Sequence, residues 1–194
     1  MKKPSELKNL VEQTKRREKI KKEKVDIKWI ITIIIVAFTI SFGLSFVANS
    51  TIPNLSLAFG IIITLLFIII GILFDIIGVS VTGADEAVFH SMAARKVKGA
   101  STAVKFKKNA DKTSSFCCDV IGDICGVISG AAGTTICAIL VTKYHTDLLI
   151  TGLVITAIIS SLTIGGKALG KSFAINKSDI ILYEFAKIVS NFYH

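Results

Sequence analysis

The chain has 194 residues, a formal net charge of +9 and a hydrophobic share of 52%, above the roughly 45–50% of soluble domains. Four long apolar runs would use about 80 residues if each crosses a hydrocarbon core about 30 Å thick. This composition leaves little chain for a soluble catalytic domain, so we expect an integral membrane protein and no enzyme.

A basic segment, residues 1–28, carries 11 of the 23 lysines and arginines. Beside an apolar span, such a segment is typical of a cytoplasmic flank that is attracted to anionic headgroups, and we expect no nucleic-acid binding. It is too long for the basic region of a cleaved signal peptide, and the apolar stretch that follows is long enough to span a bilayer. We therefore interpret the start of the chain as a signal anchor.

The first two apolar runs predict transmembrane helices over residues 29–48 and 55–79. Trp29 suits the boundary of the first span, where interfacial aromatic residues are common. The residues between the spans, 49–54, are polar or turn-forming and carry no charge. The two spans therefore predict a helical hairpin.

The segment that follows, residues 82–117, is polar and basic, and we expect it to stay in the cytoplasm. Within it, small apolar residues recur near helical spacing over residues 84–98, which predicts a belt helix along the membrane interface. Gly99 is expected to end this helix.

A third span, residues 118–142, is rich in small residues. Its glycines recur at spacings of three and four, at Gly122, Gly126, Gly130 and Gly133. Small residues let helices approach closely in lipid, so we expect this helix at the centre of the bundle. The cysteines in or beside it, Cys117, Cys118, Cys125 and Cys137, are interpreted as buried thiols.

The last elements are a fourth span over residues 147–164 and an amphipathic interfacial helix over residues 178–192. The glycine-rich stretch Gly165–Gly170 between them is expected to be a helix end. In the terminal helix, polar Glu184, Lys187 and Asn191 are expected opposite an apolar stripe of Ile181, Phe185, Ile188 and Phe192.

This arrangement places every lysine and arginine except Lys143 on one side of the bilayer, as the positive-inside rule requires. The expected fold class is therefore all-α: a multi-pass cell-membrane protein of about four transmembrane helices, with a cytoplasmic belt helix and a C-terminal amphipathic helix. Both termini are expected in the cytoplasm.

Acidic residues gather at the predicted cytoplasmic ends of spans two and three, at Asp75, Asp85, Glu86, Asp119 and Asp123. An aspartate at the centre of a membrane helix costs roughly 2.5–3.5 kcal/mol on insertion scales, so such residues are functional candidates. If the two spans pack together, their oxygen atoms could bind a hard cation. Mg²⁺ suits such a site because it keeps several waters and needs only one or two carboxylates. The candidate ligands are Glu86, Asp123, Asp119, the hydroxyls of Ser80 and Thr82, and the carbonyl beside Gly122; no organic cofactor is expected.

Two other interpretations of the acids remain open. Asp119 and Asp123, one turn apart, could relay protons or sodium ions. Alternatively, Asp85, Glu86 and Asp119 are solvated caps, since negative charge is favourable at helix N-termini. No nucleophile stands near a base in a recognisable motif, so we expect no catalytic residues.

Several short stretches carry a further pattern: Thr82-Gly-Ala-Asp-Glu86-Ala-Val-Phe-His-Ser91, Ile121-Gly-Asp-Ile and Gly166-Lys167-Ala-Leu-Gly170. They resemble S-G-x-E-T-A-x-x-S, I-G-N-T and P-K-x-L-A in the transmembrane domain of the CorB/CorC and cyclin M (CNNM) magnesium transporters. The resemblance covers residues 55–194, so the first span is an addition to it.

The resemblance implies a homodimer with a central cation cavity above a juxtamembrane belt, and it implies that Glu86, Thr82, Gly122 and Asp123 line that cavity. Asp123 stands where the family usually has asparagine, and Gly165-Gly166 replaces a stretch in which the family carries a glutamate. The CBS and CorC-type domains of the family have no counterpart in these residues. Regulation by nucleotides would therefore come from a separate protein or not exist.

Two functions follow from these observations. The first is transport or export of a divalent cation, with magnesium the expected ion, through an acidic cavity between spans two and three. The alternative is a non-transporting membrane scaffold or regulatory subunit that binds a partner protein. Loss of ion-dependent behaviour on changing Asp123 would favour the transporter.

Overall fold

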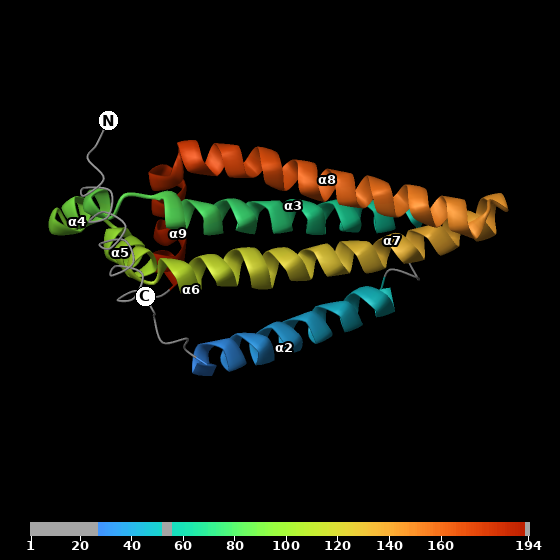
Figure 1. Ribbon diagram of the computed structural model, residues 1–194, viewed down its shortest axis with the longest axis horizontal. Coiled ribbons are helices and arrows are strands. Elements are labelled where there is room, and N and C mark those ends of the chain that lie inside the picture. Colours follow the sequence, from blue (N-terminus) through green and yellow to red (C-terminus); the bar gives the residue numbers. More distant parts are fainter. Residues whose placement is uncertain (1–26, 52–55, 193–194) are drawn as a thin grey trace, which may run out of the picture. The chain divides into compact units, whose positions relative to one another are not determined.

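The computed structural model describes residues 27–51 and 56–192, and all regular structure within these ranges is helical (Figure 1). The long helices are α2 (Ile27–Thr51), α3 (Leu57–Gly83), α7 (Asp123–Tyr144) and α8 (Leu148–Asn176). The short ones are α4 (Glu86–Ala94), α5 (Ala100–Lys108), α6 (Ala110–Ser115), the π-helix η2 (Phe116–Gly122) and α9 (Ser178–Phe192). The basic residues 1–26 and the link at 52–55 lie outside the described residues.

Four helical stretches are long and apolar enough to cross a membrane: Ile27–Val47, Leu57–Gly83, Ala110–Tyr144 and Leu148–Asn176. The third combines α6, η2 and α7 into one continuous helix. The expected all-helical, multi-pass membrane architecture is therefore confirmed by length and composition. Contacts divide the chain into residues 1–34 and 35–194, and the hairpin expected between the first two spans stays a prediction.

Helices α3, α7 and α8 pack side by side as a three-helix bundle (Figure 1). Glycines set the distance between them. A Cβ added at Gly170 of α8 would lie 2.8 Å from Cγ1 of Ile76, and one at Gly71 of α3 would lie 3.1 Å from Cβ of Cys125. Because these positions carry no side chain, the helix backbones approach closely. Van der Waals contact between closely packed helices favours their association in lipid.

The prediction that Gly165–Gly170 ends the fourth span is wrong, because α8 runs without a break to Asn176. Glycine weakens a helix by about 1 kcal/mol relative to alanine. Here Gly166 and Gly170 lie directly against Ile72 and Ile76 of α3, and this close packing offsets that cost. At its start, α8 is capped by Asp147, whose Oδ1 accepts hydrogen bonds from the backbone N–H of Leu149 and Ile150.

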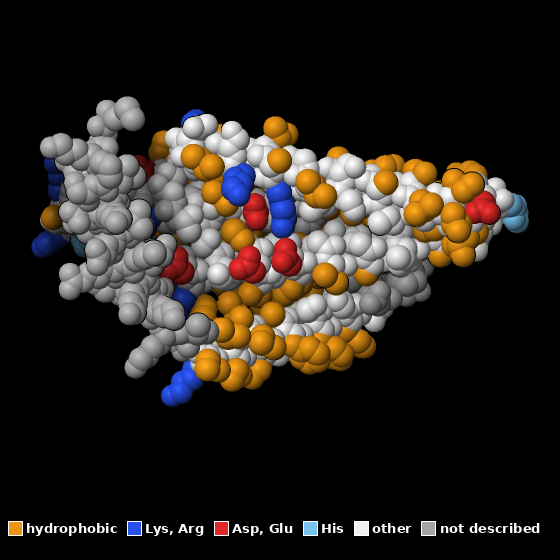
Figure 2. Space-filling model, viewed as in Figure 1, with side chains coloured by type: hydrophobic (Ala, Val, Ile, Leu, Met, Phe, Trp, Pro, Cys, Tyr) orange, Lys and Arg blue, Asp and Glu red, His pale blue; other side chains and the backbone are white. Residues whose placement is uncertain are grey.

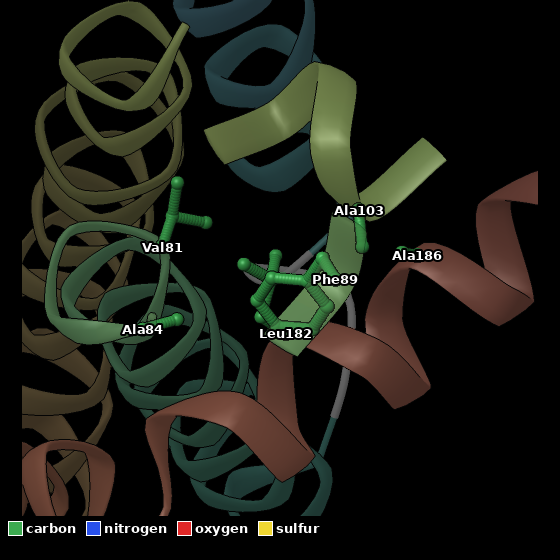
Figure 3. Packing of buried hydrophobic residues seen from close by; sticks show 6 residues of the cluster. All are labelled: Val81, Ala84, Phe89, Ala103, Leu182 and Ala186. Atoms are coloured by element: carbon green, nitrogen blue, oxygen red, sulfur yellow. The ribbon is translucent and has the colours of Figure 1, made fainter. Parts of the chain in front are cut away.

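At one end of α3, helices α4, α5 and α9 pack into what we call the platform (Figure 3). Phe89 of α4, Ala103 of α5 and Leu182 of α9 are fully buried there with Val81 at the end of α3. The ammonium of Lys107 donates hydrogen bonds to the backbone oxygen atoms of Thr82 (2.8 Å) and Val81 (3.3 Å). A cation is thereby placed on the last carbonyls of α3, where it complements the helix dipole.

Two predictions about the platform need correction. The belt helix is shorter than residues 84–98, since α4 ends at Ala94, and Gly99 caps the start of α5 instead. Gly99 has a φ of +86°, and a Cβ there would lie 2.8 Å from Cα of Lys187, so only glycine fits easily.

Helix α9 has the expected bounds, and the residues that it buries against the rest of the fold lie beside the expected apolar stripe. Leu182 and Ala186 are its fully buried residues, whereas the side chain of Ile188 is 56% exposed. Phe185 does contribute to packing, because its ring stacks on that of Phe106 at a centroid distance of 5.5 Å. Helix α9 packs mainly on α3 and α5, and the rotation of α9 about its axis decides which of its residues face them.

Candidate functional site

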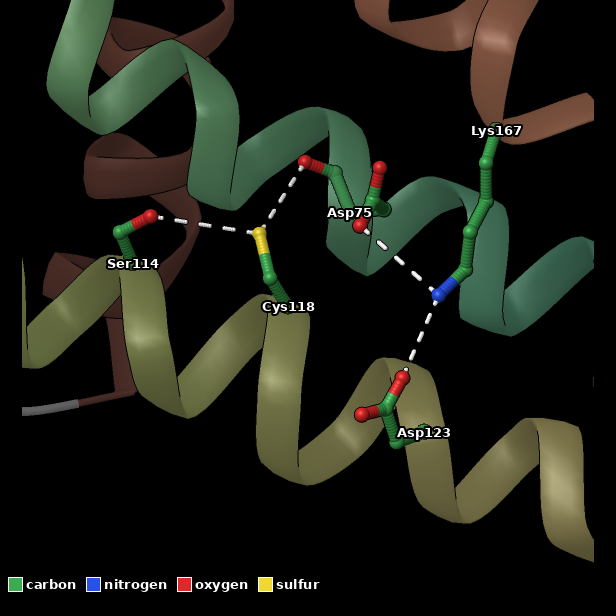
Figure 4. Close-up of polar contacts among 5 residues, drawn as sticks. All are labelled: Asp75, Ser114, Cys118, Asp123 and Lys167. Atoms are coloured by element: carbon green, nitrogen blue, oxygen red, sulfur yellow. Dashed lines mark hydrogen bonds and ion pairs between the residues drawn. The ribbon is translucent and has the colours of Figure 1, made fainter. Parts of the chain in front are cut away.

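Three charged side chains from three helices meet on one side of the bundle (Figure 4). Nζ of Lys167 in α8 lies 3.5 Å from Oδ1 of Asp123 in α7 and 3.9 Å from Oδ1 of Asp75 in α3. One ammonium thus lies between two carboxylates. We call Asp75, Asp123 and Lys167 the charged triad.

The triad lies at the edge of the predicted hydrocarbon core, on the platform side. At 1.5 Å per residue, Asp75 is about 27 Å from the start of α3 at Leu57, and Lys167 is about 29 Å from the start of α8 at Leu148. Asp123 is about 32 Å from the end of α7 at Tyr144. Each distance is close to the roughly 30 Å thickness of a hydrocarbon core, so the three charges lie at one depth.

Exposure differs strongly among the three side chains. Asp75 is 16% exposed and Lys167 is 26% exposed, whereas Asp123 is 71% exposed. Acidic and basic side chains therefore appear together on one face of the bundle (Figure 2). In a bilayer, a charge at this depth would be costly in contact with lipid.

The backbone around the triad is held by the π-helix and by close contact with α3. The thiol of Cys118 donates a 3.6 Å hydrogen bond to the backbone oxygen of Asp75, and Ser114 lies 4.0 Å from the same sulfur. Gly122, the last residue of η2, is buried, and a Cβ there would lie 3.6 Å from Nζ of Lys167. π-Helical turns are rare and occur often at functional sites.

The other predicted ligands are not brought to the triad. The hydroxyls of Ser80 and Thr82 donate to backbone oxygens of their own helix, at Ile76 (2.7 Å) and Val79 (2.8 Å). Glu86 begins α4 and contacts His90 at 3.2 Å, in agreement with the interpretation of this acid as part of a helix start. Asp119 lies exposed in η2. Within residues 27–51 and 56–192, no group of three or more histidine, cysteine, aspartate or glutamate side chains is arranged to hold a metal ion.

The candidate ligand set left out two members of the charged triad, Asp75 and Lys167. Lys167 is an ionisable residue in a long apolar segment, and such residues are rare and usually paired inside a membrane. This signal was available in the sequence. It was hidden by the expectation that the fourth span ends at Ile164, which places Lys167 in a loop.

A groove of about 200 Å³ lies between α7 and α8. It begins one turn from Asp123 and is lined by Gly126, Gly130, Thr156, Ile159, Ser160, Thr163 and Ile164. The expected close packing of the small-residue face of α7 is thus wrong at two of its four glycines: nothing lies within 4 Å of a Cβ added at Gly126 or Gly130, whereas Gly133 packs directly on Ile159.

The cysteines are free, and all but the half-buried Cys118 are buried.

Comparisons of the chain with protein-family models, curated proteins and solved structures gave no match. The relationship to the CorB/CorC and CNNM transporters therefore stays a prediction that depends on the short motifs.

Proposed function

We propose that the chain transports a divalent cation across the membrane, with magnesium the expected ion, and that Asp75 and Asp123 are its principal ligands. The observation that carries this proposal is the convergence of two carboxylates, from different membrane helices, on one positive charge. The ammonium of Lys167 lies within 4 Å of both carboxylates, which supports the idea that a bound cation could contact both.

The chemistry of the site fits a hard cation. Carboxylate oxygens are preferred ligands of Mg²⁺, which retains several waters and binds through one or two carboxylates. The exposure of Asp123 leaves room for such waters. The groove between α7 and α8 begins one turn away, and three hydroxyl groups, those of Thr156, Ser160 and Thr163, interrupt its mainly apolar lining. In this proposal Asp75 is the inner ligand and Asp123 faces the entrance.

The homodimer implied by the family resemblance is part of the proposal. A second copy against the exposed face would shield the Asp123 carboxylate from lipid, in which a charge is costly. We also propose that the platform, with its excess of lysines, lies in the cytoplasm.

A specific observation favours the alternative of a non-transporting scaffold or regulatory subunit. Lys167 already neutralises one of the two carboxylate charges, so the triad could hold α3, α7 and α8 together without binding any ion. A scaffold would keep these ion pairs permanently and would bind its partner elsewhere, for example through the platform.

Magnesium flux into proteoliposomes distinguishes the two functions. The purified chain is reconstituted, Mg²⁺ is added outside, and a trapped indicator reports uptake. Asp75→Asn and Asp123→Asn should each lower the rate about tenfold or more, which corresponds to about 1.4 kcal/mol of ion binding. Asp111→Asn, an exposed residue of α6, is the matched control and should leave the rate unchanged. No uptake by well-folded wild-type protein would contradict transport and favour the scaffold.

A further inference from the structure

The geometry points to a second role for Lys167, which rests on the proposed transport function. We infer that its ammonium is a tethered competitor for the ion site: it occupies the carboxylate pair while no metal is bound, and it must withdraw before a metal can bind. Lys167 would thereby select divalent over monovalent cations.

The first argument is spatial. A Mg²⁺ or Ca²⁺ ion binds carboxylate oxygens at about 2.0–2.6 Å. Nζ of Lys167 lies 3.5 Å and 3.9 Å from one oxygen of each aspartate, so it fills the space that a shared metal ion would need. Two positive charges about 4 Å apart repel strongly in a medium of low effective dielectric constant. Metal and ammonium therefore exclude each other.

The second argument concerns how easily the ammonium can leave. Both contacts are longer than the roughly 2.7–2.9 Å of a strong charge-assisted hydrogen bond, so Lys167 is held mainly by electrostatic attraction. Its four-carbon stem is flexible and can carry the charge toward the nearer membrane surface. Gly122 adds no side chain beside Nζ, and 26% of the lysine side chain is exposed, which leaves a path outward.

The third argument concerns charge. Two carboxylates and one ammonium have a net charge of −1, and a monovalent ion that replaces the ammonium leaves that charge unchanged. Such an ion gains no Coulomb energy over the tethered lysine and must also give up water. A divalent ion doubles the attraction to the same two carboxylates, so it can displace the lysine. Lys167 would in this way make the site selective for divalent over monovalent cations.

Equilibrium binding tests this role separately from transport. Mg²⁺ and Na⁺ affinities are measured in detergent by the ion-dependent rise of the unfolding temperature, each variant relative to its own ion-free state. Lys167→Met should bind Mg²⁺ about tenfold more tightly or better, and should gain stabilisation by Na⁺ that wild-type protein lacks. Lys171→Met is the matched control, one turn further along α8, and should change neither affinity.

Three outcomes bear on the inference. Wild-type protein that binds Mg²⁺ while Lys167→Met binds it equally or more weakly would overturn the competitor role and leave transport standing. Absence of Mg²⁺ binding in both proteins would overturn the role together with the proposed function. If Lys167→Met does not fold, Lys167→Arg tests the inference instead. A guanidinium can contact a carboxylate through two parallel hydrogen bonds and stays charged, so it should compete with Mg²⁺ more strongly than the ammonium does. It should weaken Mg²⁺ binding, and unchanged binding would overturn the inference.

Discussion

Nζ of Lys167 lies 3.5 Å from Oδ1 of Asp123, although the two residues are 44 positions apart in the chain and belong to different membrane helices. The same ammonium reaches Asp75 in a third helix. Three helices that otherwise pack through glycines and aliphatic side chains are therefore joined by charge at a single depth.

Removing the lysine should destabilise the bundle. Lys167→Met leaves the largely buried Asp75 carboxylate without its counter-charge, and we expect a loss of about 1–3 kcal/mol in the free energy of unfolding. Asp75→Asn in the same chain should restore part of this loss, because the uncompensated charge is then absent. A double-mutant cycle from unfolding in mixed micelles measures the coupling. Strictly additive effects would show that the two side chains do not interact.

A second prediction tests the packing of α3 on the π-helix. A Cβ at Gly78 would collide with Sγ of Cys118 and lie 3.1 Å from the backbone oxygen of Ser114. Gly78→Ala should therefore destabilise by about 1–3 kcal/mol through overpacking. Gly165→Ala is the matched control, since nothing lies within 4 Å of a Cβ there, and it should be neutral or stabilising by up to about 1 kcal/mol. Equal effects in both variants would contradict the packing.

A third prediction concerns the face of α9 that holds the platform. Leu182→Ala removes a fully buried side chain and should destabilise by about 2–5 kcal/mol, whereas Ile188→Ala should have little effect. Hydrogen exchange of α4 and α5 amides reports the change, because Phe89 of α4 and Ala103 of α5 belong to the same buried cluster as Leu182. Greater exchange in Ile188→Ala than in Leu182→Ala would favour the stripe expected from the sequence.

Topology gives a fourth prediction. In cells, Thr146→Cys in the short turn before α8 should react with a membrane-impermeant maleimide from outside. Ser101→Cys, exposed on α5 in the platform, should react only after the membrane is permeabilised. Both are compared with wild-type protein to account for its own cysteines. The reverse labelling pattern would place the platform outside the cell.

The membrane helices could be predicted well from the sequence because a helix that crosses a bilayer must meet strict physical requirements. A span must satisfy its backbone hydrogen bonds internally and present apolar side chains over about 20 residues. All four apolar runs meet this requirement, and α9 has the predicted bounds. Boundaries set by glycine were predicted poorly, as at Gly165 and Gly99, because the effect of a glycine depends on the helix or backbone packed against it.

The candidate site was predicted only in part for the same reason. Asp123 could be recognised from its acid character at the end of a span. Its partners could not, because the approach of Lys167 and Asp75 depends on the rotation of three helices about their axes. Glu86 and Thr82 entered the prediction through local sequence patterns, and the side chain of each contacts a residue three or four positions away in the chain.

The most direct test of the central claim is the initial rate of Mg²⁺ uptake into proteoliposomes by wild-type protein and by Asp75→Asn, reconstituted at equal density. Asp75 is the most buried member of the triad, so water has the least access to replace its carboxylate as a ligand. We predict clear uptake by the wild type and a rate about tenfold lower or less in the variant. Equal rates in the two proteins would contradict a transport site at the charged triad.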